Sequence, residues 1–146
     1  MPPDSPIPLW LPFALLGFVA LWICLVYLLA LVSGWHHLAR HFRAQEQPSG
    51  KTRSAGPFNT TIYLRKGNLY QNILRLTADD DALYLSVVFL FRTGHPPLRI
   101  PWSEITIAPA RLWFSTKVMV TLGTEEKIPM YISRSTAQKI NLALPS

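Results

Sequence analysis

Hydrophobic positions divide this chain into two unlike parts. Residues 9–32 read LWLPFALLGFVALWICLVYLLALV, and no Asp, Glu, Lys or Arg occurs from Ser5 to Leu38. As a helix, this run would measure about 36 Å, enough to cross a hydrocarbon layer of about 30 Å with some tilt. The pattern predicts a membrane-spanning helix over residues 9–34, with Pro12 tolerated near its first turn.

Two other kinds of segment share such an apolar run. A buried core helix would need a larger domain than a chain of 146 residues offers, because this run is apolar on every side. A cleaved signal peptide has a basic start and a shorter apolar stretch of about 7–15 residues. Asp4 is the only charged residue before the run. We therefore favour a retained anchor.

From Phe58 onward, short apolar runs alternate with turn residues such as Gly94-His95-Pro96-Pro97. Regular short runs of this kind predict strands of a small sandwich or barrel. The expected strands are Phe58–Leu64, Asn72–Thr77, Leu83–Phe91, Leu98–Pro101, Ile105–Phe114, Val118–Leu122 and Ile128–Ile132. Both faces of Leu83–Phe91 are apolar because Val88 and Leu90 lie opposite the alternating set. The second face is therefore expected to be covered by the helix or by another protein, or to touch the membrane.

The chain end and the junction have different patterns. Ser133 or Ser135 can cap a helix that runs to about Ala143. Residues 35–57 begin with the basic, amphipathic stretch WHHLARHFR, expected to lie against anionic headgroups, and continue as a linker rich in Gly, Ser and Pro. The expected parts are a tail (1–8), a membrane helix (9–34), a basic juxtamembrane segment with linker (35–57) and a mostly β domain (58–146).

About seven strands followed by one helix resemble the pleckstrin-homology-like (PH-like) superfold, a bent seven-stranded sheet or barrel capped by a C-terminal helix. The wording of residues 79–105 is more specific. Ala82-Leu83-Tyr84-Leu85, FLFRTGHPPL and Leu98-Arg99-Ile100-Pro101-Trp102-Ser103-Glu104-Ile105 resemble GRAM-like and bacterial PH-like domains of uncharacterised membrane-anchored proteins. Ala82 stands where those domains usually have a turn glycine. The resemblance implies a fold over residues 58–144 and brings no catalytic residues with it.

The phrase from Ile100 to Ile105 has a physical interpretation of its own. Ile100 and Ile105 are expected in the core, on either side of a tight turn that Pro101 begins. Ser103 and Glu104 can accept hydrogen bonds from backbone N–H groups of that turn. Trp102 is expected to pack over the barrel mouth. These roles make the phrase a structural motif rather than a binding site.

Basic residues gather on one side of the apolar run. The chain has 14 Lys and Arg against 8 Asp and Glu, and no Lys or Arg precedes the run. The positive-inside rule therefore predicts an extracytoplasmic N-terminus and a cytoplasmic domain at the bacterial inner (plasma) membrane. Six cations that follow the run are expected to face anionic lipid headgroups. They are Arg40, Arg43, Lys51, Arg53, Arg65 and Lys66.

Candidate chemistry is sparse. His37 and His41 share a helix face, but a metal site needs a further ligand, so interfacial histidines are the simpler interpretation. Asp79, Asp80 and Asp81 are adjacent rather than alternating as in a calcium loop, which is typical of a solvated turn. Cys24 is the only cysteine, so an intramolecular disulfide is excluded. No catalytic constellation, metal site or cofactor is expected.

These patterns favour a membrane-tethered, non-enzymatic binding module for anionic lipid headgroups or a membrane protein partner. The alternative is a structural or assembly subunit of a membrane complex, with the helix side chains Trp22, Cys24 and Tyr27 packing against other chains or another copy. An enzyme that pairs His95 with Glu104 is a third hypothesis. Nucleic acid is not expected as a partner, because no aromatic–basic motif for it is present.

Overall fold

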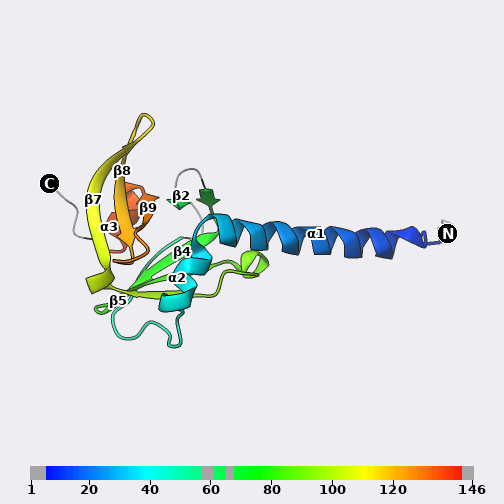
Figure 1. Cartoon of the computed structure of the whole chain (residues 1–146), viewed down its shortest axis with the longest axis horizontal. Coiled ribbons are helices and arrows are strands. Elements are labelled where there is room, and N and C mark those ends of the chain that lie inside the picture. Colours follow the sequence, from blue (N-terminus) through cyan, green and yellow to red (C-terminus); the bar gives the residue numbers. More distant parts are fainter. Residues whose placement is uncertain (1–5, 57–60, 65–67, 143–146) are drawn as a thin grey trace, which may run out of the picture.

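The computed structural model describes residues 6–56, 61–64 and 68–142. Helix α1 (Trp10–Val32) projects from the rest of the molecule as a long arm (Figure 1). Its most apolar window has a mean hydropathy of 2.8, and only 11% of that window is buried. The predicted apolar helix is therefore present, it is long and apolar enough to cross a membrane, and it is mostly exposed.

Helix α2 (Trp35–Phe42) follows α1 after a sharp change of direction. Gly34 makes this turn with φ of 84°, a left-handed conformation that glycine adopts without steric cost. The apolar side of α2 carries Trp35 and Leu38, which are both completely buried. Because this side packs into the domain, the expected contact of an amphipathic turn with headgroups is wrong for its apolar face.

The first antiparallel sheet has the order β1-β4-β5-β6, formed by Arg53–Ala55, Leu74–Ala78, Ala82–Val87 and Leu98–Pro101. Leu76 of β4 pairs with Leu85 of β5, and Leu85 pairs with Leu98 of β6. This register places leucines side by side on the buried face. Strand β1 lies inside the expected linker, so the chain joins the sheet before residue 58.

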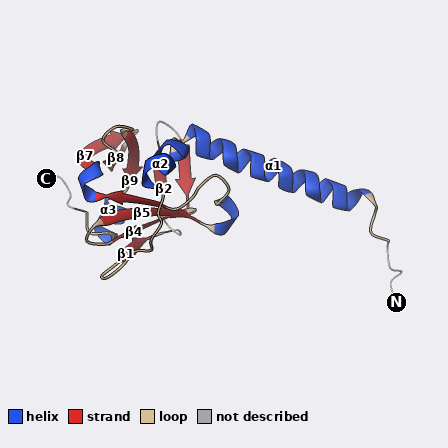
Figure 2. Cartoon of the chain, turned by 60° about the horizontal axis from the view of Figure 1, so that its bottom comes forward, coloured by secondary structure: helices blue, strands red, loops and turns tan. Residues whose placement is uncertain are grey.

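The second antiparallel sheet has the order β3-β2-β9-β8-β7. Its strands are β2 (Thr61–Leu64), β3 (Asn68–Gln71), β7 (Ile105–Leu112), β8 (Ser115–Leu122) and β9 (Ile128–Ile132). The buried residues of β9 alternate with less buried ones, as expected for a strand with one face on the core. The short helix α3 (Arg134–Lys139) follows β9, as Figure 2 shows.

One hydrophobic core joins these elements. It includes side chains from both sheets and α3, together with Trp35 and Leu38 of α2 and Ala30 of α1. Ser133 caps α3 by accepting a hydrogen bond from the Thr136 backbone N–H at 3.1 Å, as the sequence predicted. The last part of α1 and all of α2 are therefore structural parts of the domain.

The fold class is confirmed only in part. The described residues form a mixed α and β structure with two open antiparallel sheets, so the expected mostly-β, seven-stranded sheet or barrel is not confirmed. Strand β3 was not expected, because a turn was predicted at its first residue, Asn68. Two strand boundaries were also wrong. Strand β5 ends at Val87, and Phe89–Phe91 form the 3-10 helix η1. The β7–β8 turn lies at Trp113 and Phe114, two residues before the expected turn, and Trp113 adopts a φ of 60° there.

Candidate functional site

The β5–β6 connection, residues 88–97, runs back along both helices. At its far end, the indole nitrogen of Trp22 donates a hydrogen bond to the Leu90 carbonyl at 3.1 Å, and the Trp22 ring meets Phe91 edge-on. At its near end, the indole nitrogen of Trp35 donates to the Pro96 carbonyl at 2.9 Å. The connection therefore follows the helices from the middle of α1 to α2, where β6 begins.

Gly94 lies at the closest approach between this connection and α1. A Cβ atom on Gly94 would lie 2.9 Å from the Tyr27 ring and 3.2 Å from the Ala30 Cβ, and Gly94 has a φ of +74°. Both the close approach and the backbone conformation favour glycine. Tyr27, which the sequence offered as a contact to other chains, instead packs against the protein's own β5–β6 connection on this side.

A buried polar cluster lies under the α1–α2 turn. The Tyr70 hydroxyl donates to Ser33 Oγ at 2.8 Å and lies 2.9 Å from Nε2 of His95. Nδ1 of His95 lies 3.2 Å from the Thr93 carbonyl oxygen. Burial raises the pKa of Tyr70 to about 12, and burial lowers the pKa of His95 below its ordinary value. The cluster is therefore a neutral hydrogen-bonded joint between α1, β3 and the β5–β6 connection.

An open groove of about 630 Å³ lies beside this joint, where α1 meets α2. Tyr27 of α1 borders one side, and the prolines of the β5–β6 connection border another. Three exposed arginines, Arg40, Arg43 and Arg92, line it together with His36. Its lining contains no carboxylate side chain, and no arginine in the described part of the chain forms an ion pair. We call these three side chains the groove arginines.

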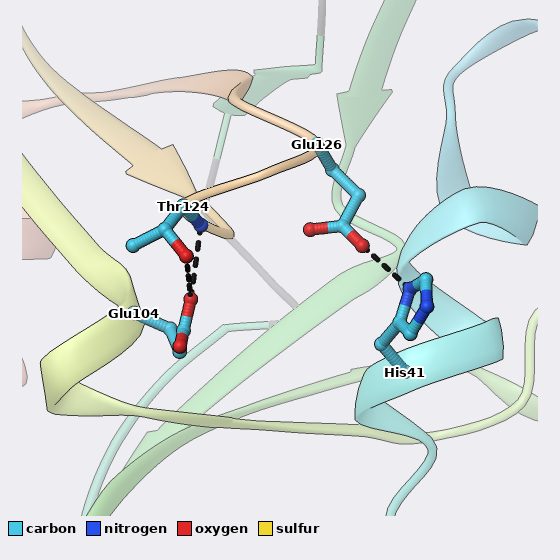
Figure 3. Close-up of polar contacts among 4 residues, drawn as sticks. All are labelled: His41, Glu104, Thr124 and Glu126. Atoms are coloured by element: carbon cyan, nitrogen blue, oxygen red, sulfur yellow. Dashed lines mark hydrogen bonds and ion pairs between the residues drawn. The ribbon is translucent and has the colours of Figure 1, made fainter.

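A second groove, of about 460 Å³, lies on the other side of Arg43 and has mixed charge. Glu46 and Glu104 line it together with Arg43 and Arg99. Glu104 accepts hydrogen bonds from the Thr124 backbone N–H at 2.9 Å and from the Thr124 hydroxyl at 2.6 Å (Figure 3). These two bonds hold the pKa of Glu104 below its ordinary value. The carboxylates make this groove a poorer site for an anion than the first one.

Two of the predicted lipid-facing cations, Arg40 and Arg43, line the first groove. Lys51 lies just before β1 and Arg53 lies on it; both are exposed, and neither lines the first groove. Arg65 and Lys66 lie outside the described residues. Sequence reasoning missed Arg92, whose signal was a single cation directly after the apolar triplet Phe89-Leu90-Phe91.

The phrase from Ile100 to Ile105 joins separate turns. Ile100 is completely buried and Ile105 is half-buried. The Trp102 indole nitrogen donates to the Asp79 carbonyl at 3.0 Å, and therefore fastens the β4–β5 turn. Ser103 is exposed in the 3-10 helix η2 (Trp102–Glu104). Glu104 accepts from the β8–β9 turn rather than from its own turn, and Pro101 pairs with Ala82 at the end of β6.

Asp79 is mainly a structural residue. Its Oδ1 accepts hydrogen bonds from the backbone N–H groups of Asp81 at 3.0 Å and Ala82 at 2.8 Å. Burial opposes ionisation of Asp79, yet these hydrogen bonds lower its pKa overall. Asp80 and Asp81 are exposed, as expected for a solvated turn. The three residues therefore close the β4–β5 turn.

The histidines have separate surroundings. Nδ1 of His41 lies 2.5 Å from Oε1 of Glu126, which joins α2 to the β8–β9 turn (Figure 3). No group of three His, Cys, Asp or Glu side chains suitable for a metal occurs in residues 6–56, 61–64 and 68–142. His95 contacts Tyr70 and Thr93, whereas Glu104 contacts Thr124, so the two residues of the enzyme hypothesis have different partners.

Comparisons with protein-family models, with curated proteins and with solved structures found no match. What the protein binds is therefore inferred from its apolar helix, its buried joint and its two grooves.

Proposed function

We propose that this protein is a single-pass membrane protein whose domain is a non-enzymatic binding module for anionic lipid headgroups. The observation that carries the proposal is the placement of the groove arginines next to the end of α1. Tyr27, which borders the groove, lies about 7.5 Å of helix rise before Val32. If α1 crosses the bilayer, the groove opens at the headgroup level.

The chemistry of the groove fits a phosphate group. Guanidinium groups bind phosphate oxygens through paired hydrogen bonds, and no carboxylate lines this groove. Arg43 also borders the second groove with Glu46 and Glu104, but it forms no ion pair among the described residues. Each cation held near an anionic leaflet gains about 1 kcal/mol. Three arginines beside a fixed anchor therefore favour anionic lipid without any need for high affinity in solution.

Lipid binding can be tested on the full chain in mild detergent. Native mass spectrometry would compare retained phosphatidylglycerol with phosphatidylcholine of the same acyl chains. We expect the wild-type protein to retain phosphatidylglycerol preferentially, and the variant Arg40→Gln/Arg43→Gln/Arg92→Gln to lose that preference. The matched control Arg111→Gln/Arg134→Gln/Lys139→Gln removes three exposed positive charges that do not line the groove. Equal loss in both variants, or no preference in the wild-type protein, would contradict the proposal.

The proposal also includes the orientation of α1 across the membrane. The basic residues after α1 support an extracytoplasmic N-terminus and a cytoplasmic domain at a bacterial inner membrane. The C-terminal helix α3 after the last strand is the feature that the domain shares with the expected PH-like fold. A C-terminal alkaline phosphatase fusion should be inactive, because that enzyme matures only outside the cytoplasm. An active fusion would reverse the orientation.

A structural or assembly subunit is the second candidate, and the β7–β8 turn favours it. Trp113 is 86% exposed and Phe114 is fully exposed at the tip of this hairpin, which rises crosswise to α1 at the far side of the domain (Figure 1). Large apolar side chains at an exposed tip are typical of a protein contact. Loss of a co-purifying membrane protein in Trp113→Ser/Phe114→Ser, with lipid preference unchanged, would favour this candidate.

A further inference from the structure

The tip of the β5–β6 connection is an apolar projection. It consists of Val88 and the 3-10 helix Phe89–Phe91, and we call these four residues the prong. Phe89 is 79% exposed and Leu90 is 66% exposed, whereas Phe91 packs against the core. Exposing two adjacent apolar side chains of this size to water has an unfavourable free energy. Strand β5 ends at Val87, so pairing within the sheet does not explain why they are apolar.

The depth of the prong along α1 is fixed by Trp22. The indole of Trp22 contacts both Leu90 and Phe91, and Trp22 lies about 15 Å of helix rise before Val32. Figure 1 shows the connection turning back beside α1. Neighbouring side chains of α1 on the outer side, such as Ile23 and Leu25, are exposed like those of the prong. Whatever surrounds this part of α1 therefore also surrounds the prong.

Three backbone carbonyls of the prong have hydrogen-bond partners. The carbonyls of Val88 and Phe89 accept hydrogen bonds from the N–H groups of Phe91 at 2.9 Å and Arg92 at 3.2 Å. The Leu90 carbonyl, at the tip, accepts from the Trp22 indole. In hydrocarbon, a backbone polar group without a partner is costly, so these three paired carbonyls lower the cost of placing the prong there. Trp22 thus supplies the partner that an isolated loop would lack.

We propose that the prong inserts into the acyl-chain layer of the leaflet nearest the domain, beside α1. This inference rests on the proposed membrane span of α1. The protein then contacts the acyl chains through two apolar elements instead of one. Arg92 follows the prong directly and lines the groove, with a side chain long enough to reach the headgroups. Insertion therefore fixes the groove arginines at the lipid surface.

The test places one fluorescent reporter at three positions. Cys24 is replaced in Cys24→Ser, and single cysteines are introduced in full-length protein as Leu90→Cys, Leu16→Cys or Trp113→Cys. Each is labelled with an environment-sensitive dye in nanodiscs of phosphatidylcholine and phosphatidylglycerol. Quenching is measured with aqueous iodide and, separately, with acyl chains brominated near their middle. Leu16 is the exposed membrane control on α1, and Trp113 is the exposed control on the remote hairpin.

We expect the Leu90 label to behave like the Leu16 label, with blue-shifted emission, loss of most iodide quenching and strong quenching by brominated chains. Phe89→Cys should report the same result, which guards against a local disturbance at Leu90. If iodide quenches both prong labels as it quenches the Trp113 label while Leu16 stays protected, the prong inference fails and the anchor stands. Protection from both quenchers would mean that a protein covers the prong, which also overturns lipid insertion. Iodide quenching of Leu16 itself would overturn the proposed membrane span.

Discussion

The two halves of α1 have similar composition and different surroundings. In residues 10–21 every side chain is exposed, as expected for a helix whose partner is lipid alone. In residues 22–32, Val26 and Ala30 are buried and Trp22 bonds to the β5–β6 connection. The second half is therefore both an apolar segment and a part of the domain core. A helix packed in this way transmits its position to the domain, whereas a flexible linker would leave the domain free to turn.

The largest expected loss of stability comes from a substitution beside the buried polar cluster, where α2 meets the domain. Trp35→Ala removes a completely buried indole that bonds to Pro96 and packs on Tyr70 and His95. We expect the free energy of unfolding to fall by about 3–5 kcal/mol, since a large core side chain is lost. Chemical denaturation of the full chain in detergent, followed by far-ultraviolet circular dichroism, measures it.

Leu16→Ala is the matched control for that substitution. Leu16 is 67% exposed and lies in the half of α1 that contacts no other element. Its effect on domain stability should stay within about 0.5 kcal/mol, as for surface substitutions generally. Equal losses in both variants would mean that α1 and the domain unfold together without a boundary between the halves.

Substitutions at two glycines test the same difference between the packed and exposed halves of α1, with an expected loss of stability of intermediate size. Gly94→Ala brings a Cβ to 2.9 Å from the Tyr27 ring, at a φ of +74°. We expect a loss of about 1–3 kcal/mol, because overpacking adds to the backbone strain. Gly17→Ala introduces its Cβ into open space in the exposed half of α1 and should not destabilise the domain. Hydrogen exchange at β5 and β6 amides would locate the loss, and unchanged exchange in Gly94→Ala would contradict the close contact.

The sequence predicted what depends on local pattern. The apolar helix, the cap at Ser133, the Asp79–Asp81 turn and β6 follow from periodicity and turn chemistry, and they appear close to the expected positions. The prong does not follow from these rules. Alternation continues through Phe89 and Phe91, so it predicted a longer strand, but the chain turns at Val88, whose N–H bonds to Ile73.

The candidate site was harder to predict, because it depends on contacts between distant residues. Arg40 and Arg43 were found through the charge asymmetry around α1, whereas Arg92 reaches the groove only because Gly94 lets its connection lie on α1. Likewise, Ser33, Tyr70 and His95 come from three elements and share no sequence pattern. The charge pattern predicted that the cations lie on the domain side of α1. Which of them line the same groove depends on packing between distant residues.

The smallest expected effect is a pH dependence that reports on the joint alone. The folded pKa of His95 lies below its ordinary value of 6.5, because burial disfavours the charged ring. The unfolded chain therefore binds more protons, so this stability is complete above pH 6.5 and declines as the pH falls through the lowered pKa. Asp79 and Glu104, whose pKa values are also lowered, contribute stability above the ordinary carboxyl pKa and lose it only at lower pH, as their carboxylates become protonated. Denaturation midpoints between pH 6.5 and 5 should thus fall in the wild-type protein and stay flatter in His95→Gln. An identical decline in both proteins would place the titrating group outside the joint.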